Sequence, residues 1–147
     1  MILHGGLVAW RRGGLWRGVL IQGPSGVGKS DLALRAVDGG ACLVADDRVL
    51  LWKSGDRLYG RAPDALCGLT EVRGVEVMGC SHIRYAEVAL SVRCEAGQAE
   101  IARLYDGEED EVLGVSLPCV RLHPCEASAP AKLRRAFDRL GRAARPS

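Results

Sequence analysis

The stretch Gly23-Pro24-Ser25-Gly26-Val27-Gly28-Lys29-Ser30 satisfies the pattern G-x-x-x-x-G-K-[ST] at every position. Apolar residues dominate positions 15–21 before it, as in a buried strand, and apolar residues recur at helical spacing at positions 32, 33, 36 and 37 after it. Strand, glycine-rich loop and helix, in that order, are the setting in which this pattern binds a phosphate chain. The sequence therefore predicts an α/β fold organised around a nucleotide-binding loop.

The residue types of the loop match this chemistry. Gly23, Gly26 and Gly28 allow consecutive backbone N–H groups to point inward, where a helix N-terminus adds partial positive charge. Lys29 would reach the β- and γ-phosphates, and the Ser30 hydroxyl would be a ligand of the Mg²⁺ that bridges them. We predict that the whole loop binds the nucleotide: Gly23, Pro24, Ser25, Gly26, Val27, Gly28, Lys29 and Ser30. The flanking strand and helix disfavour the alternative, a glycine-rich turn with a chance lysine.

Length and composition indicate one ordinary globular domain over residues 1–147. Apolar residues make up 48% of the chain and charged ones 26%, and the formal net charge of +2 gives no argument for nucleic acid or a membrane surface. No apolar run approaches the ~20 residues of a membrane span, and no signal peptide opens the chain. The six cysteines lack metal-site spacing, so we expect small apolar side chains, reduced thiols and a cytoplasmic protein.

Two stretches concentrate charge. Residues 106–111 form an acidic run that we expect to be a surface loop, and six basic residues lie within the last sixteen positions, on an expected helix over about 130–144. Both are expected to be solvated surface, although a charged partner for either remains the alternative.

The other periodicities predict a mixed order of strands and helices. Residues 4–22 resemble a hairpin and residues 29–37 a short helix. Strands are expected at 42–45, 49–52, 57–60, 71–78 and 85–94, the last with one wet face, and edge strands at 112–115 and 120–122 around Pro118. Residues 63–67 suggest one helical turn, and residues 78–84 a loop.

A pair of carboxylates, Asp46 and Asp47, ends the strand over 42–45. Side chains of adjacent strand residues diverge, so both can face one site only if the strand has ended there. Their roles must therefore differ.

Five short motifs occur in an order and spacing that resemble the catalytic domain of the bacterial HPr kinase/phosphorylase family over residues 2–122. They are His4-Gly5-Gly6, the loop itself, Leu43-Val44-Ala45-Asp46-Asp47, Gly60-Arg61-Ala62-Pro63 and Glu71-Val72-Arg73-Gly74. The resemblance implies a single P-loop kinase domain with a mixed β-sheet, akin to phosphoenolpyruvate carboxykinase. It also implies ATP and Mg²⁺ as cofactors, a serine of an HPr-like phosphocarrier protein as acceptor, and a hexamer.

The resemblance also suggests individual roles. It makes His4 an active-site histidine, and the alternative is a neutral polar residue at a strand start. We assign Asp47 as the base that accepts the serine proton and Asp46 as a metal contact, with the reverse assignment nearly as well supported. Glu71 would be a second Mg²⁺ ligand and Arg73 would stabilise the transferred phosphate; otherwise these two form an exposed ion pair.

The chain departs from the family pattern at two places. It begins almost at the first catalytic strand, so we expect the N-terminal domain of longer members to be absent. Residues 122–128 lack the arginines that the family carries there, which predicts a kinase with weak or no phosphorylase activity.

Two rival functions remain open. A P-loop phosphotransferase for a small metabolite would need a lid with arginines, for which Arg84 is the only obvious candidate. A non-catalytic ATP sensor should lack a base, and Asp46, Asp47 and Glu71 argue against it.

Overall fold

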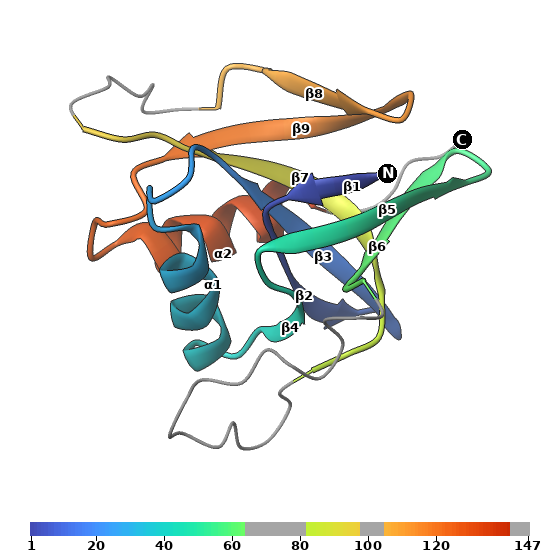
Figure 1. The fold of residues 1–147 in the computed structure, drawn as a ribbon, viewed down its shortest axis with the longest axis horizontal. Helices are drawn as coiled ribbons and strands as arrows, with labels where there is room; N and C mark the ends of the chain where they lie inside the picture. Colours follow the sequence, from blue (N-terminus) through green and yellow to red (C-terminus); the bar gives the residue numbers. More distant parts are fainter. Residues whose placement is uncertain (64–81, 98–104, 142–147) are drawn as a thin grey trace.

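The computed structural model describes residues 1–63, 82–97 and 105–141, which form a mixed sheet and two helices (Figure 1). The expectations for residues 64–81, including the strand over 71–78, lie outside the described residues. The elements are β1 (Ile2–His4), β2 (Gly6–Arg12), β3 (Leu15–Gln22), α1 (Lys29–Asp38), β4 (Cys42–Ala45), β5 (Arg48–Ser54), β6 (Arg57–Arg61), β7 (Ala86–Cys94), β8 (Glu109–Val112), β9 (Val115–Leu122) and α2 (Ala129–Leu140).

Strand β7 is the centre of the sheet. It pairs in parallel with β3 along one edge, while its other edge is shared by β6 at its start and by β9 at its end. The path continues to β5 and β1 beyond β6, and to β2 and β4 beyond β3. Because β3 and β7 run in the same direction, both deliver their last residues to the edge where the phosphate loop begins.

The predicted N-terminal hairpin is confirmed for β2 and β3 but not for the first residues. β1 leaves the hairpin and pairs with β5 instead. The break falls at Gly5, where a β-carbon would lie 2.5 Å from the carbonyl oxygen of Ile21. Only a glycine allows the chain to pass this close to β3 before it turns outward.

Two apolar cores occupy the two faces of the sheet. The first packs α1 and α2 against β2, β3 and β7, with Leu32, Leu133 and Phe137 fully or almost fully buried. The second lies on the opposite face and includes Leu7, Leu20, Val49 and Leu117 from β2, β3, β5 and β9. Figure 1 shows the helices side by side on one face and the β8–β9 pair across the top.

Both predicted helices are present. α1 extends one residue beyond the expected 29–37, to Asp38, and Gly39 is its C-cap; α2 carries a proline in its first turn. The ring of Trp10 packs 4.8 Å from that of Phe137, and the guanidinium of Arg134 stacks over Trp10. Arg12 bonds Asp138, so the amphipathic face of α2 is fixed on β2. The part of the expected helix after residue 141 lies outside the described residues.

The β8–β9 region corrects three expectations. The acidic run is only partly loop, since β8 begins at Glu109. The predicted strand 112–115 is instead the last residue of β8, a turn at 113–114 and the first residue of β9. β9 is an interior strand with Pro118 inside it. It tolerates the proline because pairing with β7 starts only at Cys119.

The cysteines fit the expected packing role only in part. Cys94 and Cys119 are buried free thiols, and Cys125 is an exposed one. Cys42 is buried but disulfide-bonded, so the expectation of reduced thiols is wrong at this position. Among the described residues no helix is long and apolar enough to cross a membrane.

A substitution at Gly60 would test how tightly the second core is packed. A β-carbon there would lie 2.8 Å from a methyl of Leu7 and 3.1 Å from one of Val49. We expect Gly60→Ala to lower the free energy of unfolding by about 1–3 kcal/mol through overpacking, measured by urea denaturation. Gly39→Ala is the control, because the nearest atom is 3.5 Å away and φ is −88°. Equal stabilities of the two variants would contradict the packing argument.

Candidate functional site

The phosphate loop leaves the end of β3 and enters α1 through residues in left-handed conformations. Gly26 has φ 81° and Gly28 has φ 115°, a region that L side chains rarely adopt. Gly23 also passes close to β7, because a β-carbon there would lie 2.9 Å from the carbonyl oxygen of Cys94. The glycines of the motif are therefore required by both conformation and packing.

The N-terminus of α1 is open to an anion. Gly28 is its N-cap, and no side chain caps the helix. The first backbone N–H groups of a helix have no intrahelical partner, and the helix dipole places partial positive charge on them. This geometry provides the phosphate cradle that the motif predicts.

The two polar side chains of the motif have defined partners. Lys29 Nζ donates to the carbonyl oxygens of Gly23 and Pro24, at 2.7 and 3.0 Å, so the ammonium is held across the loop. Ser30 Oγ donates to Asp46 Oδ1 at 2.8 Å. That bond joins the first turn of α1 to the end of β4.

Asp46 and Asp47 form a tight turn between β4 and β5. The backbone N–H of Arg48 donates to the carbonyl oxygen of Asp46 at 2.8 Å, and Asp47 between them has φ 71°. These features define a γ-turn with positive φ, a strained conformation that clusters at functional sites. Because β4 has ended at Ala45, strand alternation no longer directs the two carboxylates to opposite faces, which is the condition that the sequence analysis set for both to face one site.

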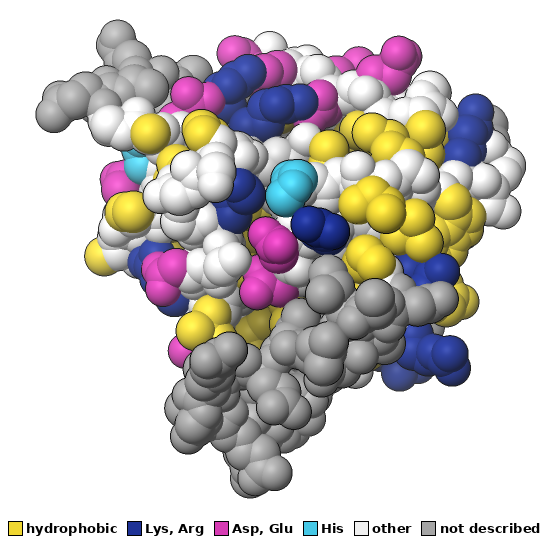
Figure 2. Space-filling model, in the orientation of Figure 1, with side chains coloured by type: hydrophobic (Ala, Val, Ile, Leu, Met, Phe, Trp, Pro, Cys, Tyr) yellow, Lys and Arg dark blue, Asp and Glu magenta, His cyan; other side chains and the backbone are white. Residues whose placement is uncertain are grey.

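His4 lies at the same edge. It is the last residue of β1, and the next residue, Gly5, donates its backbone N–H to the carbonyl oxygen of Asp47 at 2.9 Å. Figure 2 shows a histidine side chain beside a basic one near the middle of this face, with acidic side chains just below. The structure thus brings His4 and the carboxylate pair to the phosphate loop, whereas Glu71 and Arg73 lie outside the described residues.

The donor set fits Mg²⁺ bound together with a nucleotide. No cluster of three or more His, Cys, Asp or Glu side chains able to hold a metal exists within residues 1–63, 82–97 and 105–141. The neighbouring oxygens of Ser30 and Asp46 are hard ligands, and Mg²⁺ is commonly held by one or two such groups plus substrate phosphates and water. Ser30 and Asp46 would hold the ion here.

The segment after β9 packs directly on the loop. Arg35 of α1 donates to the carbonyl oxygens of Pro124 and Glu126, at 2.6 and 2.7 Å. This bonding places Pro124 and Cys125 next to Gly28. The Cys125 sulfur would lie 3.6 Å from a β-carbon added at Gly28, which is an ordinary van der Waals contact. The two side chains of this segment that approach Gly28 are therefore uncharged.

Arg121, the arginine of β9 nearest to this segment, could supply the positive charge that residues 122–128 lack, but it is already engaged. Its guanidinium bonds Glu95 at 2.5 Å and Glu108 at 2.6 Å. Hydrogen bonds to these carboxylates raise its pKa further above the ordinary value.

A polar network that the sequence analysis missed lies beneath the loop. Gln22, the residue before Gly23, donates to Ser91 Oγ at 2.8 Å and to Asp110 Oδ2 at 3.0 Å. Ser91 also donates to Asp110, and Arg93 donates to both carboxylate oxygens. Ser91 is fully buried against Asp110 of β8, whereas Glu87 and Arg93 are half-buried, so the predicted wet face of β7 is only partly exposed.

The Asp110 carboxylate stays ionised, because its hydrogen-bond donors lower its pKa by more than burial raises it. Burial alone would raise its pKa, but the hydrogen bonds from Arg93, Ser91 and Gln22 outweigh burial and lower it below 3.8. Only the polar residue directly before Gly23 could have suggested such a network in the sequence.

Cys94, at the end of β7, borders the loop without adding charge. Burial raises the pKa of its thiol to about 11, against the opposing effect of Lys29. The thiol therefore stays neutral at physiological pH.

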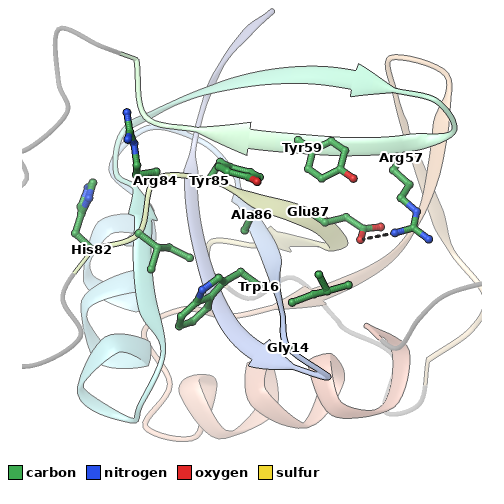
Figure 3. A pocket seen from close by; sticks show the side chains of 11 residues that line it. Gly14, Trp16, Arg57, Tyr59, His82, Arg84, Tyr85, Ala86 and Glu87 are labelled. Atoms are coloured by element: carbon green, nitrogen blue, oxygen red, sulfur yellow. Dashed lines mark ion pairs between the residues drawn. The ribbon is translucent and has the colours of Figure 1, made fainter.

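A cavity of about 550 Å³ lies elsewhere, at the end of β3 and β7 opposite to the phosphate loop. Figure 3 shows Tyr59 and Tyr85 on one side, Trp16 on the other, and the ion pair of Arg57 and Glu87 at one end. Arg84 lines this cavity. Since strands rise about 3.3 Å per residue, the six residues from Trp16 to Gln22 separate the cavity from the loop by about 20 Å.

Fold and site together define an α/β domain that carries a phosphate-binding loop beside a pair of carboxylates. The chain belongs to the HPr kinase family: the family model described as the HPr Serine kinase C-terminal domain matches residues 2–128. This confirms the resemblance found in the five sequence motifs.

Curated relatives agree with this membership. The chain is 40% identical over 116 residues to the HPr kinase/phosphorylase of Streptococcus mutans and 39% identical over 118 residues to that of Streptococcus salivarius. These matches cover 71% of this chain, and the chain spans only 37–38% of the relatives' length.

A solved structure supports the fold. The Hpr(Ser) kinase/phosphatase from Coxiella burnetii superposes with a TM-score of 0.70 at 20% identity, over 95% of both chains. The predicted α/β class with a mixed sheet is therefore confirmed.

Asp110 provides a test of the network. We expect Asp110→Asn to lower the free energy of unfolding by roughly 1.5–3 kcal/mol at pH 7, because charge-assisted hydrogen bonds are lost. The native pKa is lowered, so this contribution is present above the unfolded pKa of 3.8 and disappears as the pH falls through the native value.

Urea denaturation of both proteins from pH 7 to pH 2 measures the difference. Glu111→Gln is the control, since Glu111 is exposed on the same strand. A difference that stays constant down to pH 2 would contradict the ionised network.

Proposed function

We propose that the protein is a Mg²⁺- and ATP-dependent serine kinase that phosphorylates an HPr-like phosphocarrier protein. The observation that carries the proposal is the 2.8 Å hydrogen bond from Ser30 to Asp46, which joins the phosphate loop to the carboxylate pair. A loop for the donor phosphates and a carboxylate for the acceptor proton are the parts that phosphoryl transfer requires. Membership of the HPr kinase family supplies the acceptor class.

In this proposal each residue of the site has a separate role in phosphoryl transfer. The backbone N–H groups of the loop and Lys29 bind the donor phosphates. Ser30 and Asp46 would hold Mg²⁺, which when bound would neutralise negative charge on the phosphates. Asp47 accepts the proton of the acceptor serine's hydroxyl group. The oxygen of that serine forms a bond to the γ-phosphorus while the bond between the γ-phosphorus and ADP breaks. The Ser30–Asp46 hydrogen bond favours this division, because it sets Asp46 on the metal side. Glu71 as a further metal ligand and Arg73 as a phosphate contact complete the proposed set.

We further propose that phosphorylase activity is weak or absent. Removing phosphate from the carrier with inorganic phosphate requires two anions close together, which repel unless fixed cations compensate. The segment beside Gly28 contributes a proline and a thiol there, and Arg121 is engaged with Glu95 and Glu108.

The rival functions find less support. The lid candidate of a metabolite kinase, Arg84, lines the cavity at the opposite end of β3 and β7. A sensor without catalysis would not need Asp47 held in a strained turn. A cytoplasmic location, where ATP and the carrier occur, and a hexameric assembly belong to the same proposal.

The function is tested by incubating the purified protein with radiolabelled ATP, Mg²⁺ and HPr-type carriers from the same cell. Label on a carrier serine is the expected result. Label that appears only in free phosphate or in a small metabolite would overturn the proposal.

Lys29→Ala should abolish carrier phosphorylation, because the ammonium that crosses the loop is lost. The fold should survive, since Lys29 lies outside both cores, and circular dichroism can verify this. Lys53→Ala is the matched control, because Lys53 is an exposed lysine of β5. Unchanged turnover in Lys29→Ala would remove the loop from the mechanism.

Asp47→Asn should retain ATP affinity but lose phosphoryl transfer by ~10²- to 10⁴-fold, because an amide cannot accept the proton. Asp46→Asn should instead raise the Mg²⁺ concentration needed for activity. Rates over a magnesium titration, together with nucleotide binding by calorimetry, separate the two. The opposite pattern would exchange the two assignments.

A further inference from the structure

The cavity at the start of β3 and β7 is a slot with aromatic walls. Tyr59 and Tyr85 line one side and Trp16 lines the other (Figure 3). Trp16 rests on the second core and is half-buried, Tyr59 is also half-buried, and Tyr85 is 55% exposed. The volume of about 550 Å³ is typical of small-molecule sites. Because burial of wet aromatic surface is favourable, the slot suits a flat ring that can stack between its walls.

The tyrosine wall is held in place by contacts within the protein. The ring of Tyr59 stacks on that of Trp52 from β5, with 5.7 Å between the centroids. Tyr85 meets Tyr59 edge-on at 6.3 Å, and Tyr59 is also the register partner of Glu87 on the β6–β7 ladder. A ligand that enters the slot therefore has little side-chain entropy to remove from this wall, which favours binding.

One end of the slot presents an acceptor without a close donor. Arg17 and Arg57 approach the Glu87 carboxylate to 3.5 and 3.6 Å, distances at which the charges attract but a good hydrogen bond is not formed. Within the described part of the chain this carboxylate accepts no hydrogen bond, and its side chain is only 16% exposed. An N–H group on the edge of a bound ring would satisfy it, as carboxylates do with the amino groups of nucleobases.

The other end carries an unpaired positive charge. Arg84 lines the cavity at the end away from the Arg57–Glu87 ion pair (Figure 3). It is exposed, and among the residues that the structure describes its guanidinium has no ion-pair or hydrogen-bond partner. Three residues of extended chain span at most about 10 Å, so one small molecule can reach both Glu87 and Arg84. Since three guanidinium groups stand against a single carboxylate here, the ligand should carry negative charge.

We propose that this cavity binds a purine nucleoside monophosphate, at a site separate from the phosphate loop. The two-ring base stacks between Trp16 and the pair of tyrosines, whose ring centroids are far enough apart for a purine to cover both. An amino group of the base donates to Glu87, and the phosphate group binds the Arg84 guanidinium. A single unpaired guanidinium suits one phosphate group rather than a chain of them. The site goes beyond the proposed function and does not rest on it.

The test is calorimetric titration of AMP into the protein saturated with Mg²⁺ and tripolyphosphate. Tripolyphosphate occupies the phosphate loop but has no base for the slot, so AMP is directed to the cavity. We expect one AMP per chain, and no binding of ribose 5-phosphate, which lacks the base. Arg84→Gln and Tyr85→Ala should each weaken AMP binding about 10-fold or more, whereas Tyr85→Phe should bind AMP like the unaltered protein because the ring is kept.

Two substitutions outside the cavity serve as matched controls. Arg139 is an exposed arginine of α2, on the opposite face of the sheet from the second core, and Tyr105 is a 43% exposed tyrosine that does not line the slot. Arg139→Gln and Tyr105→Ala should leave AMP affinity unchanged. The site would be overturned by absence of AMP binding, by AMP affinity that Arg84→Gln or Tyr85→Ala leaves unaltered, or by a loss that the controls share. Carrier phosphorylation does not enter this measurement, so its failure would leave the result intact.

Discussion

The hydrogen bond from Ser30 to Asp46 is the contact on which the site depends, because it joins the start of helix α1 to the end of strand β4. Ser30 stands in the first turn of α1, and Asp46 stands where β4 gives way to β5. For the two side chains to meet, β2 must carry β4 alongside the hairpin, and the chain at Gly5 must pass close to Ile21. The close packing of small residues at this edge therefore determines the geometry of the candidate active site.

The phosphate loop is supported from below as well as from the side. Gln22, Ser91, Arg93 and Asp110 bring β3, β7 and β8 into one polar network directly before Gly23. A carboxylate enclosed this far remains ionised because four donors compensate for burial. Arg35 ties the segment after β9 to α1 on the other side of the loop. The loop is consequently held between two sets of hydrogen bonds, which favours a pre-formed phosphate cradle over one that orders on binding.

Charge around the site is distributed unevenly, and this affects which reactions it favours. The two side chains that approach Gly28 are uncharged, and Arg93 and Arg121 are neutralised by acidic partners. Much of the acidic run that the sequence presented as a solvated patch serves inside these pairs, since Asp110 and Glu108 bond arginines of β7 and β9. A site with few uncompensated cations suits the movement of one phosphoryl group better than the joint binding of two anions.

The sequence by itself determined the phosphate loop, the α1 helix, the hairpin of β2 and β3, the carboxylate pair at a strand end, and the family. These features are local: glycine spacing, helical or alternating periodicity and motif order are written in neighbouring residues. Only the tertiary structure decided that β1 leaves the hairpin for β5, that β8 joins the sheet through β9, and that His4 and Arg48 are partners on the β1–β5 ladder. Each of these depends on contacts between residues far apart in the chain, and no local pattern encodes which strands meet or which charges neutralise one another.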